Sequence, residues 1–213
     1  MYEHTRFKMG VGLWFRLTLI VPLLVTVGPL APTDTEVGGP IISDTTWTAV
    51  NSPYIAVESV EVWEGVTLII EPGVTVKFDS HKKLQVNGEL IARGTGSSPI
   101  IFTSNQPAPA PGDWGNIEFT STAITTTMDA DGSYIGGSIL RYCVVEYAGY
   151  DASSAIEAHS LLIDHCTVRD NDARGIRNSG TQSTLSRITN NYVSENSNSS
   201  GQFSGGGIYA EYQ

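Results

Sequence analysis

The sequence predicts an all-β fold in which the chain winds into a parallel solenoid, with coils of roughly 22–25 residues. Two observations predict it: short runs of alternating apolar and polar residues, and a set of positions that repeats along the chain. Composition agrees, because charged residues make up only 16% of the chain and glycines number 22, which favours strands and turns. No window after residue 44 has the 3.6-residue apolar stripe of an amphipathic helix.

The alternating runs begin near residue 44 and are separated by Gly, Asn, Pro or Asp. Such alternation is typical of strands that bury one face. We therefore expect strands within residues 54–62, 66–70, 74–78, 83–92, 99–104 and 116–121.

The repeat is clearest in three later segments, LRYCVVEYA, IDHCTVRDN and ITNNYVSEN, which begin at nearly even spacing at Leu140, Ile163 and Ile188. Other positions then correspond in three columns: Val145, Val168 and Val193; Cys143, Cys166 and Asn191; Ala148, Asn171 and Asn196. Similar spacing relates Val62 to Val86 and Phe78 to Phe102. A coil this short cannot bury its own apolar residues, so stacked coils must share one core.

The N-terminus predicts a targeting segment. Basic residues occur within the first 16 positions, and an uncharged apolar run, LTLIVPLLVTVGPLA, fills residues 17–31. This order is typical of a signal peptide over residues 1–31, with an uncleaved membrane anchor as the alternative. Residues 32–43 are expected to be a linker, and residues 44–213 the solenoid domain.

Charge and the expected leader together indicate where the chain acts. The formal net charge of −10 argues against a nucleic-acid partner and against an anionic membrane surface, apart from the leader itself. We expect a protein that is secreted or displayed at the cell surface.

The sequence stops within a repeat, at GGGIYAEYQ, without a recognisable capping segment. A solenoid end exposes unpaired backbone groups and is normally covered. We therefore expect the domain to be incomplete or its last coil to be covered by a partner, including another copy of the chain.

Several segments resemble right-handed parallel β-helix repeat proteins of the pectin-lyase-like superfamily. They are GVTLIIEPGVTVKF, LQVNGELIARGT, PIIFTS, PGDWGNIEF, LRYCVVEYAG and GGGIYAE, and the likeness covers roughly residues 44–213. The resemblance implies a right-handed coil. It does not choose an activity, because the superfamily includes polysaccharide lyases, glycoside hydrolases, epimerases and adhesins.

Two function classes follow from the resemblance. The first is a scaffold, adhesion or glycan-binding protein without assignable catalysis, whose ligand is a polysaccharide or a cell-surface glycan. The second is a carbohydrate-active enzyme, either a polysaccharide lyase or a glycoside hydrolase. We favour the first, because no catalytic motif of these enzymes is matched residue by residue.

The segment LLIDHCTVRDN concentrates the side chains from which nucleophilic sites are made. Cys166 shares the register of Cys143 and the strand face of Val168, so we expect both cysteines to fill the core. A catalytic cysteine is the alternative, and a disulfide between the two remains open. His165 takes the opposite face and is expected at the surface.

The carboxylates are the candidate catalytic residues: Asp164, Asp170, Asp172 and Glu195, with Arg169 beside them. Asp170 and Glu195 lie one coil apart and could be neighbours on the outer face. Two close carboxylates suit glycoside hydrolysis, and several oxygen ligands suit Ca²⁺. The alternative is that these residues only form turns, whose geometry Asp tolerates.

A second calcium candidate lies in MDADGSYIGGS, where Asp129 and Asp131 resemble the start of a calcium loop. The twelfth position is Leu140 rather than Glu, so a glycine-rich surface loop is the simpler expectation. No other cofactor is expected. Residues 105–116 form a proline-rich excursion in which Trp114 either stacks on a sugar, as Tyr150 also could, or covers the core edge.

Overall fold

The computed structural model describes residues 34–179, 186–199 and 206–210, which all belong to one compact unit, Ala31–Gln213. The regular secondary structure of the described residues consists of strands and one short 3₁₀ helix, η1 (Ala49–Asn51). In this part of the chain no helix has the length and apolar character that a membrane span requires. The expected leader, residues 1–31, lies outside the described residues.

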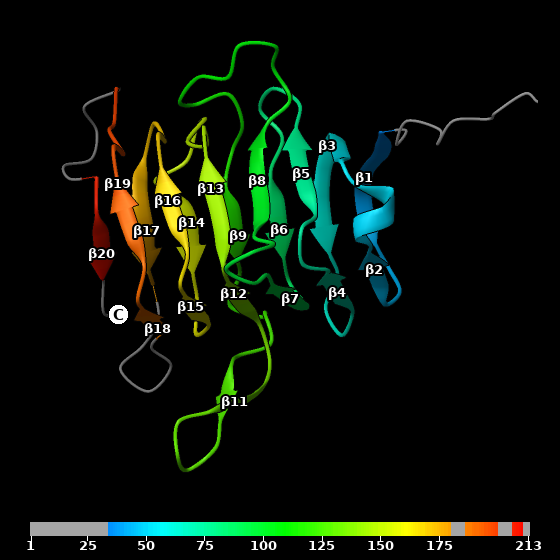
Figure 1. Cartoon of the computed structure of the whole chain (residues 1–213), viewed down its shortest axis with the longest axis vertical. Helices are drawn as coiled ribbons and strands as arrows, with labels where there is room; N and C mark the ends of the chain where they lie inside the picture. Colours follow the sequence, from blue (N-terminus) through cyan, green and yellow to red (C-terminus); the bar gives the residue numbers. More distant parts are fainter. Residues whose placement is uncertain (1–33, 180–185, 200–205, 211–213) are drawn as a thin grey trace, which may run out of the picture. The chain divides into compact units, whose positions relative to one another are not determined.

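Each coil of the chain contributes three short strands, which pair in parallel with the coils before and after it (Figure 1). The first strand of each coil lies in a six-stranded sheet. Its members are β2 (Thr45–Trp47), β4 (Thr67–Ile70), β7 (Glu89–Arg93), β12 (Ile139–Arg141), β15 (Leu162–Asp164) and β18 (Arg187–Thr189).

The second and third strands of each coil form two limbs of a twelve-stranded sheet, joined through β3 (Tyr54–Val62). Limb 1 contains residues 54–56 of β3, β5 (Thr75–Phe78), β8 (Ile100–Ser104), β13 (Cys143–Glu146), β16 (Thr167–Arg169) and β19 (Tyr192–Ser194). Limb 2 contains residues 60–62 of β3, β6 (Leu84–Val86), β9 (Ile117–Phe119), β14 (Ser154–Ala158), β17 (Arg174–Asn178) and β20 (Ile208–Ala210). This is the expected right-handed parallel β-helix.

The predicted register is confirmed for the later coils. Val145 pairs with Val168 and Val168 with Val193, while Leu140 pairs with Ile163. Inward-facing Leu, Ile, Val and Phe from successive coils stack into one continuous core, as expected if no coil can bury its apolar residues alone.

One earlier equivalence is wrong. Phe78 pairs with Ser104, and it is Val76 that pairs with Phe102. Between equivalent positions, the chain advances five residues from Ile70 to Thr75 but nine from Ala92 to Ile101. The longer turn therefore widens the offset between these two coils from 22 residues at β4 and β7 to 26 residues at β5 and β8.

The segment expected to be a linker contains a strand. β1 (Thr35–Ile41) pairs in parallel with β3, and Val37 and Ile41 pack against the core. Among the described strands β1 pairs only with β3 and so lies at an edge, where the missing N–H donor of Pro40 costs little.

Two insertions interrupt the coils. The proline-rich excursion ends at Trp114, which is buried, stacks on Phe78 with ring centroids 4.2 Å apart, and donates from Nε1 to the Glu146 carbonyl at 2.8 Å. Trp114 therefore covers the core and is not available to a sugar. The glycine-rich segment forms an antiparallel hairpin, β10 (Thr127–Met128) and β11 (Tyr134–Gly136).

Candidate functional site

The polar cluster in LLIDHCTVRDN follows from two bends that flank the later limb 1 strands. Residues at both bends have positive φ, which is uncommon for residues other than glycine. The bend before the strand is formed by Tyr142 (φ 49°), His165 (φ 55°) and Asn190 (φ 56°). The bend after it is formed by Tyr147 (φ 63°), Asp170 (φ 55°) and Glu195 (φ 53°). Two residues that made the segment look catalytic, His165 and Asp170, therefore form its turns.

Cys143 and Cys166 are buried and face the core, as predicted, and both are free thiols. Cys166 Sγ lies 3.4 Å from the Leu140 carbonyl oxygen, to which it donates. Burial raises the pKa of Cys143 well above its usual value, and the side-chain hydrogen bond with Cys166 is the second largest cause of this rise. A protonated and enclosed thiol is a poor nucleophile, so the arrangement supports a packing role.

Asp164 lies on the outer face of the six-stranded sheet and is almost enclosed by its own cluster. One carboxylate oxygen, Oδ1, accepts hydrogen bonds from Thr189 Oγ1 and Asn190 Nδ2, both at 2.9 Å, and lies 2.9 Å from His165 Nδ1. Oδ2 lies 3.2 Å from Arg141 Nε, close enough for an ion pair although the two atoms are not aligned for a hydrogen bond. Asp164 thus holds four neighbouring side chains in place.

The pKa of Asp164 reflects these contacts. Burial by itself raises the pKa, but the hydrogen bonds from Asn190, His165 and Thr189, with the charge of His165, outweigh burial and lower it below its usual value. A carboxylate with a lowered pKa stays ionised, so Asp164 is better suited to a structural role as an anion than to donating a proton.

The other candidate carboxylates do not gather around Asp164. Arg169 links Asp170, at 2.9 Å, to Glu146, at 2.6 Å, on the outer face of limb 1. Asp172 instead accepts hydrogen bonds from the backbone and hydroxyl of Ser199. Glu195 is exposed, one coil beyond Asp170 in register.

The calcium candidates lie at the tip of the β10–β11 hairpin. Asp129 Oδ1 accepts hydrogen bonds from the backbone N–H groups of Asp131 and Ser133, at 3.0 and 2.7 Å, so this carboxylate closes a tight turn. Among the residues that the structure describes, no three His, Cys, Asp or Glu side chains are grouped closely enough to hold a metal ion.

Sequence reasoning missed a polar groove on the outer face of limb 2, with a volume of about 550 Å³. Glu118 on β9 and Glu157 on β14 are direct neighbours in register there. Glu118 forms an ion pair with Lys83 at 2.7 Å, and Glu157 forms one with Arg177 at 2.6 Å. The groove also contains backbone and side-chain groups of Asn116, Thr120, Ser121, Asp151, Ser153, His159 and Ser179.

This groove continues into a hollow of about 450 Å³, because Thr120 and Ser121 line both. Trp63 lies in the hollow with 49% of its surface exposed. Asn87 crosses its floor: its Nδ2 donates to Glu61 at 2.7 Å, and its Oδ1 accepts from Thr120 at 3.0 Å. We call the groove and the hollow together the limb 2 groove.

A signal for the limb 2 groove does exist in the sequence. Glu118 and Glu157 each stand at an outward position between inward apolar residues, in IEF and AIEA. The two strands, however, are separated by the hairpin and two further strands, although Ile117 pairs directly with Ile156. A search for repeats of roughly 22–25 residues cannot align them.

Comparisons with known proteins agree with the architecture. The sequence profile of the pectate-lyase-like β-helix domain matches residues 39–163. Protein bark beetle of Drosophila melanogaster is 46% identical over 67 residues, which are 32% of this chain and 2% of that protein's length. No solved structure matches the chain with significance.

Proposed function

The chain belongs to the family of pectate-lyase-like β-helix domains, and we propose that it acts as a glycan-binding module, secreted or displayed at the cell surface. The observation that carries this proposal is the limb 2 groove. It combines an exposed tryptophan with a row of hydroxyl, amide, carboxylate and cationic side chains on one continuous face.

The dimensions of the groove suit an extended chain of sugars. The outward positions Glu61, Gln85, Glu118, Glu157 and Arg177 follow one another in register on five consecutive coils. With strands about 4.8 Å apart, this row is about 19 Å long. A polysaccharide lying along it would meet a new polar side chain at each coil.

The chemistry of the lining also suits sugars. A pyranose ring presents an apolar face of C–H groups, for which the exposed indole of Trp63 offers a flat apolar surface. Its hydroxyl groups require fixed donors and acceptors, and the bonds among Asn87, Glu61 and Thr120 hold such groups in place. Ligand sites of this kind owe their specificity to a few well-placed polar groups.

Export belongs to the proposal through the N-terminal segment. A basic stretch followed by the uncharged apolar run of residues 17–31 is typical of a signal peptide, and a glycan ligand would be met outside the cell. At the cell surface, glycan binding would serve adhesion.

A second candidate function, glycoside hydrolysis, is favoured by the adjacent carboxylates Glu118 and Glu157. Hydrolases of this type place two carboxyl groups on either side of the bond that is cleaved. We rank this function second because each glutamate already forms an ion pair with its own cation, Lys83 or Arg177.

A glycan array probed with the full exported chain tests the first proposal. We expect binding to a defined set of glycans, reduced at least tenfold by Trp63→Ala and unchanged by Tyr192→Ala, which removes an exposed aromatic ring from limb 1. Binding that is indifferent to Trp63→Ala would contradict the proposal.

The same glycans, incubated with the protein and assayed for new reducing ends, test the second. Release of reducing ends that is abolished by Glu118→Gln and by Glu157→Gln would make the protein a hydrolase. No release from a glycan that binds would leave glycan binding as its function.

A further inference from the structure

A separate groove lies on the outer face of the six-stranded sheet, and it has a different chemistry. An apolar column runs across this face in register through Ile69, Ile91, Ile139 and Leu162. The β10–β11 hairpin is tied to this face where Thr126 Oγ1 accepts from the Leu162 backbone N–H at 2.8 Å, and Ile139 and Leu162 are buried. Ile69 remains 39% exposed, and Ile91 remains half-buried.

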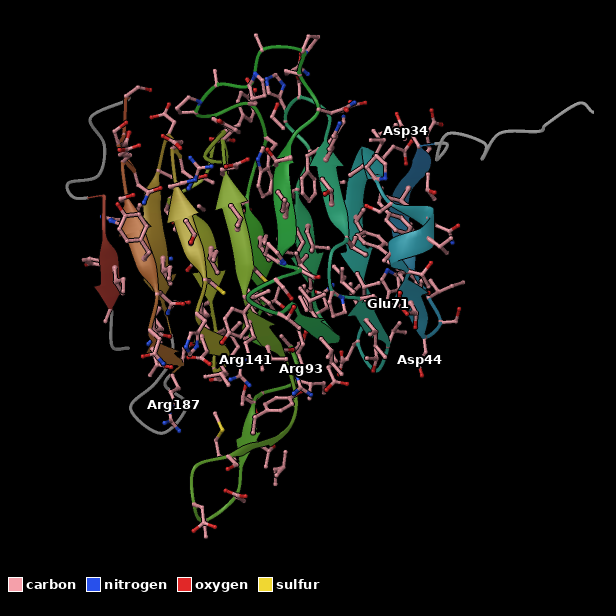
Figure 2. All side chains as sticks on the ribbon, viewed as in Figure 1. Asp34, Asp44, Glu71, Arg93, Arg141 and Arg187 are labelled. Carbon is pink, nitrogen blue, oxygen red and sulfur yellow. The ribbon has the colours of Figure 1, made fainter. Side chains whose placement is uncertain are left out.

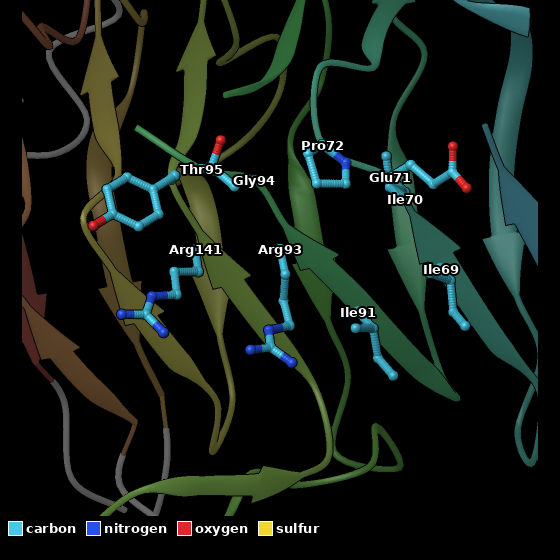
Figure 3. A pocket seen from close by; sticks show the side chains of 10 residues that line it. Ile69, Ile70, Glu71, Pro72, Ile91, Arg93, Gly94, Thr95 and Arg141 are labelled. Carbon is cyan, nitrogen blue, oxygen red and sulfur yellow. The ribbon is translucent and has the colours of Figure 1, made fainter. Parts of the chain in front are cut away.

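Two arginines stand beside the uncovered end of this column. Arg93 and Arg141 are paired in register on β7 and β12, and their side chains extend in the same direction beside Ile91 and Ile69 (Figure 3). They line a groove of about 530 Å³ that also includes Pro72 and Tyr142. We call it the arginine groove. In Figure 2, Arg93 and Arg141 lie side by side in the lower half of the view.

The positive charge of the arginine groove is only partly neutralised by neighbouring carboxylates. Arg141 has Asp164 at 3.2 Å, whereas Arg93 has no ion pair within the described ranges and instead lies over the Tyr134 ring, 5.3 Å from its centroid. The carboxylate of Glu71 is turned away and accepts a hydrogen bond from the Ala49 backbone N–H at 2.9 Å. Like charges on neighbouring strands repel, so an anion shared between the two guanidinium groups would be stabilised.

We propose that the arginine groove binds a small amphipathic carboxylate, with its carboxylate between Arg93 and Arg141 and its apolar body over Ile69 and Ile91. Guanidinium groups bind carboxylates through paired, charge-assisted hydrogen bonds. The isoleucines and Pro72 offer an apolar surface that water solvates poorly. The volume lies within the usual range of small-molecule sites, about 300–1,000 Å³.

This proposal gives the Asp164 cluster a role. Asp164 fixes Arg141 from the side away from Arg93, and His165 packs against the Tyr142 ring with centroids 4.7 Å apart. Asp164 and His165 are therefore positioning residues that build one wall of the groove. The proposal does not depend on glycan binding, because the two grooves share no lining residue.

Titration calorimetry of the full exported chain with octanoate, and with its uncharged ester methyl octanoate, tests the proposal. We expect saturable octanoate binding that is at least tenfold tighter than binding of the ester. Acetate, which has the carboxylate without the apolar body, should bind at least tenfold more weakly than octanoate. Equal affinity for octanoate and its ester, or no octanoate binding, would overturn the proposal.

Variants locate the site. Arg93→Gln should weaken octanoate binding at least tenfold, and Arg93 is chosen because, among the described residues, it holds no ion pair that the fold would lose. The matched control Lys83→Gln removes a cation from limb 2 and should leave octanoate binding unchanged. Equal loss in both variants would mean a nonspecific charge effect and would also overturn the proposal. Trp63→Ala distinguishes the two proposals, because it should affect glycans and not octanoate.

Discussion

Asn171→Ala should be among the most destabilising single substitutions in the fold. Asn171 is fully buried at the second bend of its coil, and its side chain makes three hydrogen bonds. Its Oδ1 accepts from the Ala148 backbone N–H at 2.8 Å. Its Nδ2 donates to the Val145 carbonyl at 3.2 Å and to Asn196 Oδ1 at 2.7 Å. The asparagine therefore links three consecutive coils along the helix axis.

The size of the effect follows from the groups that the substitution leaves behind. The Ala148 N–H and Asn196 Oδ1 would remain buried without a partner, at about 1–3 kcal/mol each. Together with the cavity, the loss is about 3–5 kcal/mol, a large part of the roughly 5–15 kcal/mol by which domains are usually stable.

Urea unfolding followed by tryptophan fluorescence measures this loss. The control is Asn105→Ala, which removes one bond, to Asp79 Oδ1, near the surface and should cost about 1 kcal/mol. If Asn171→Ala cost no more than Asn105→Ala, the buried amide would not be what holds the coils together.

Four further outcomes are expected. Val168→Asp places an unpaired charge in the core and should lower the melting temperature by many degrees; an unchanged thermal melt would refute the core assignment. Because the folded-state pKa of Asp164 is lowered, its carboxylate stabilises the fold above the unfolded pKa of about 3.9, and this stability is lost as pH falls through the lower folded value. Between pH 6 and lower pH, the free energy of unfolding measured with urea should therefore fall less for Asp164→Asn than for the wild type. An equal fall in the two proteins would refute this. Amides of β18, β19 and β20, each paired with one other described strand, should exchange hydrogen faster than those of β12 to β16; equally slow exchange would mean that those strands are covered. Finally, mass spectrometry of the secreted protein should find residues 1–31 removed, and an intact Met1 would favour an anchor.

The later coils could be predicted from the sequence because their connections barely change in length. Leu140, Ile163 and Ile188 pair in register at nearly even spacing along the chain, and both bends keep their positive-φ residues in column. Equivalent positions then stand out directly, and the inward direction of Cys166 follows from that of Val168.

The limb 2 groove could not be predicted in this way, because long connections separate its strands. In limb 2, Leu84 pairs with Ile117 across the proline-rich excursion, and Ile117 pairs with Ile156 across the hairpin. These separations of 33 and 39 residues are not multiples of a period of roughly 22–25 residues, so only the structure shows which outward residues become neighbours. The strand pairing that brings Glu118 beside Glu157 is long-range for the same reason.

Both insertions cover apolar side chains even though they interrupt the repeat. Trp114, at the end of the proline-rich excursion, stacks on Phe78 and is bonded to the Glu146 carbonyl, so a segment that looks like a surface loop closes one side of the core. On the other side, Ile139 is buried beside the hairpin, whereas Ile69 is left open at the arginine groove. Stacking requires only that the inward-facing residues of successive coils stay in register. The connections at the surface can therefore vary in length. The exposed faces of this fold, rather than its core, are therefore where we propose that ligands bind.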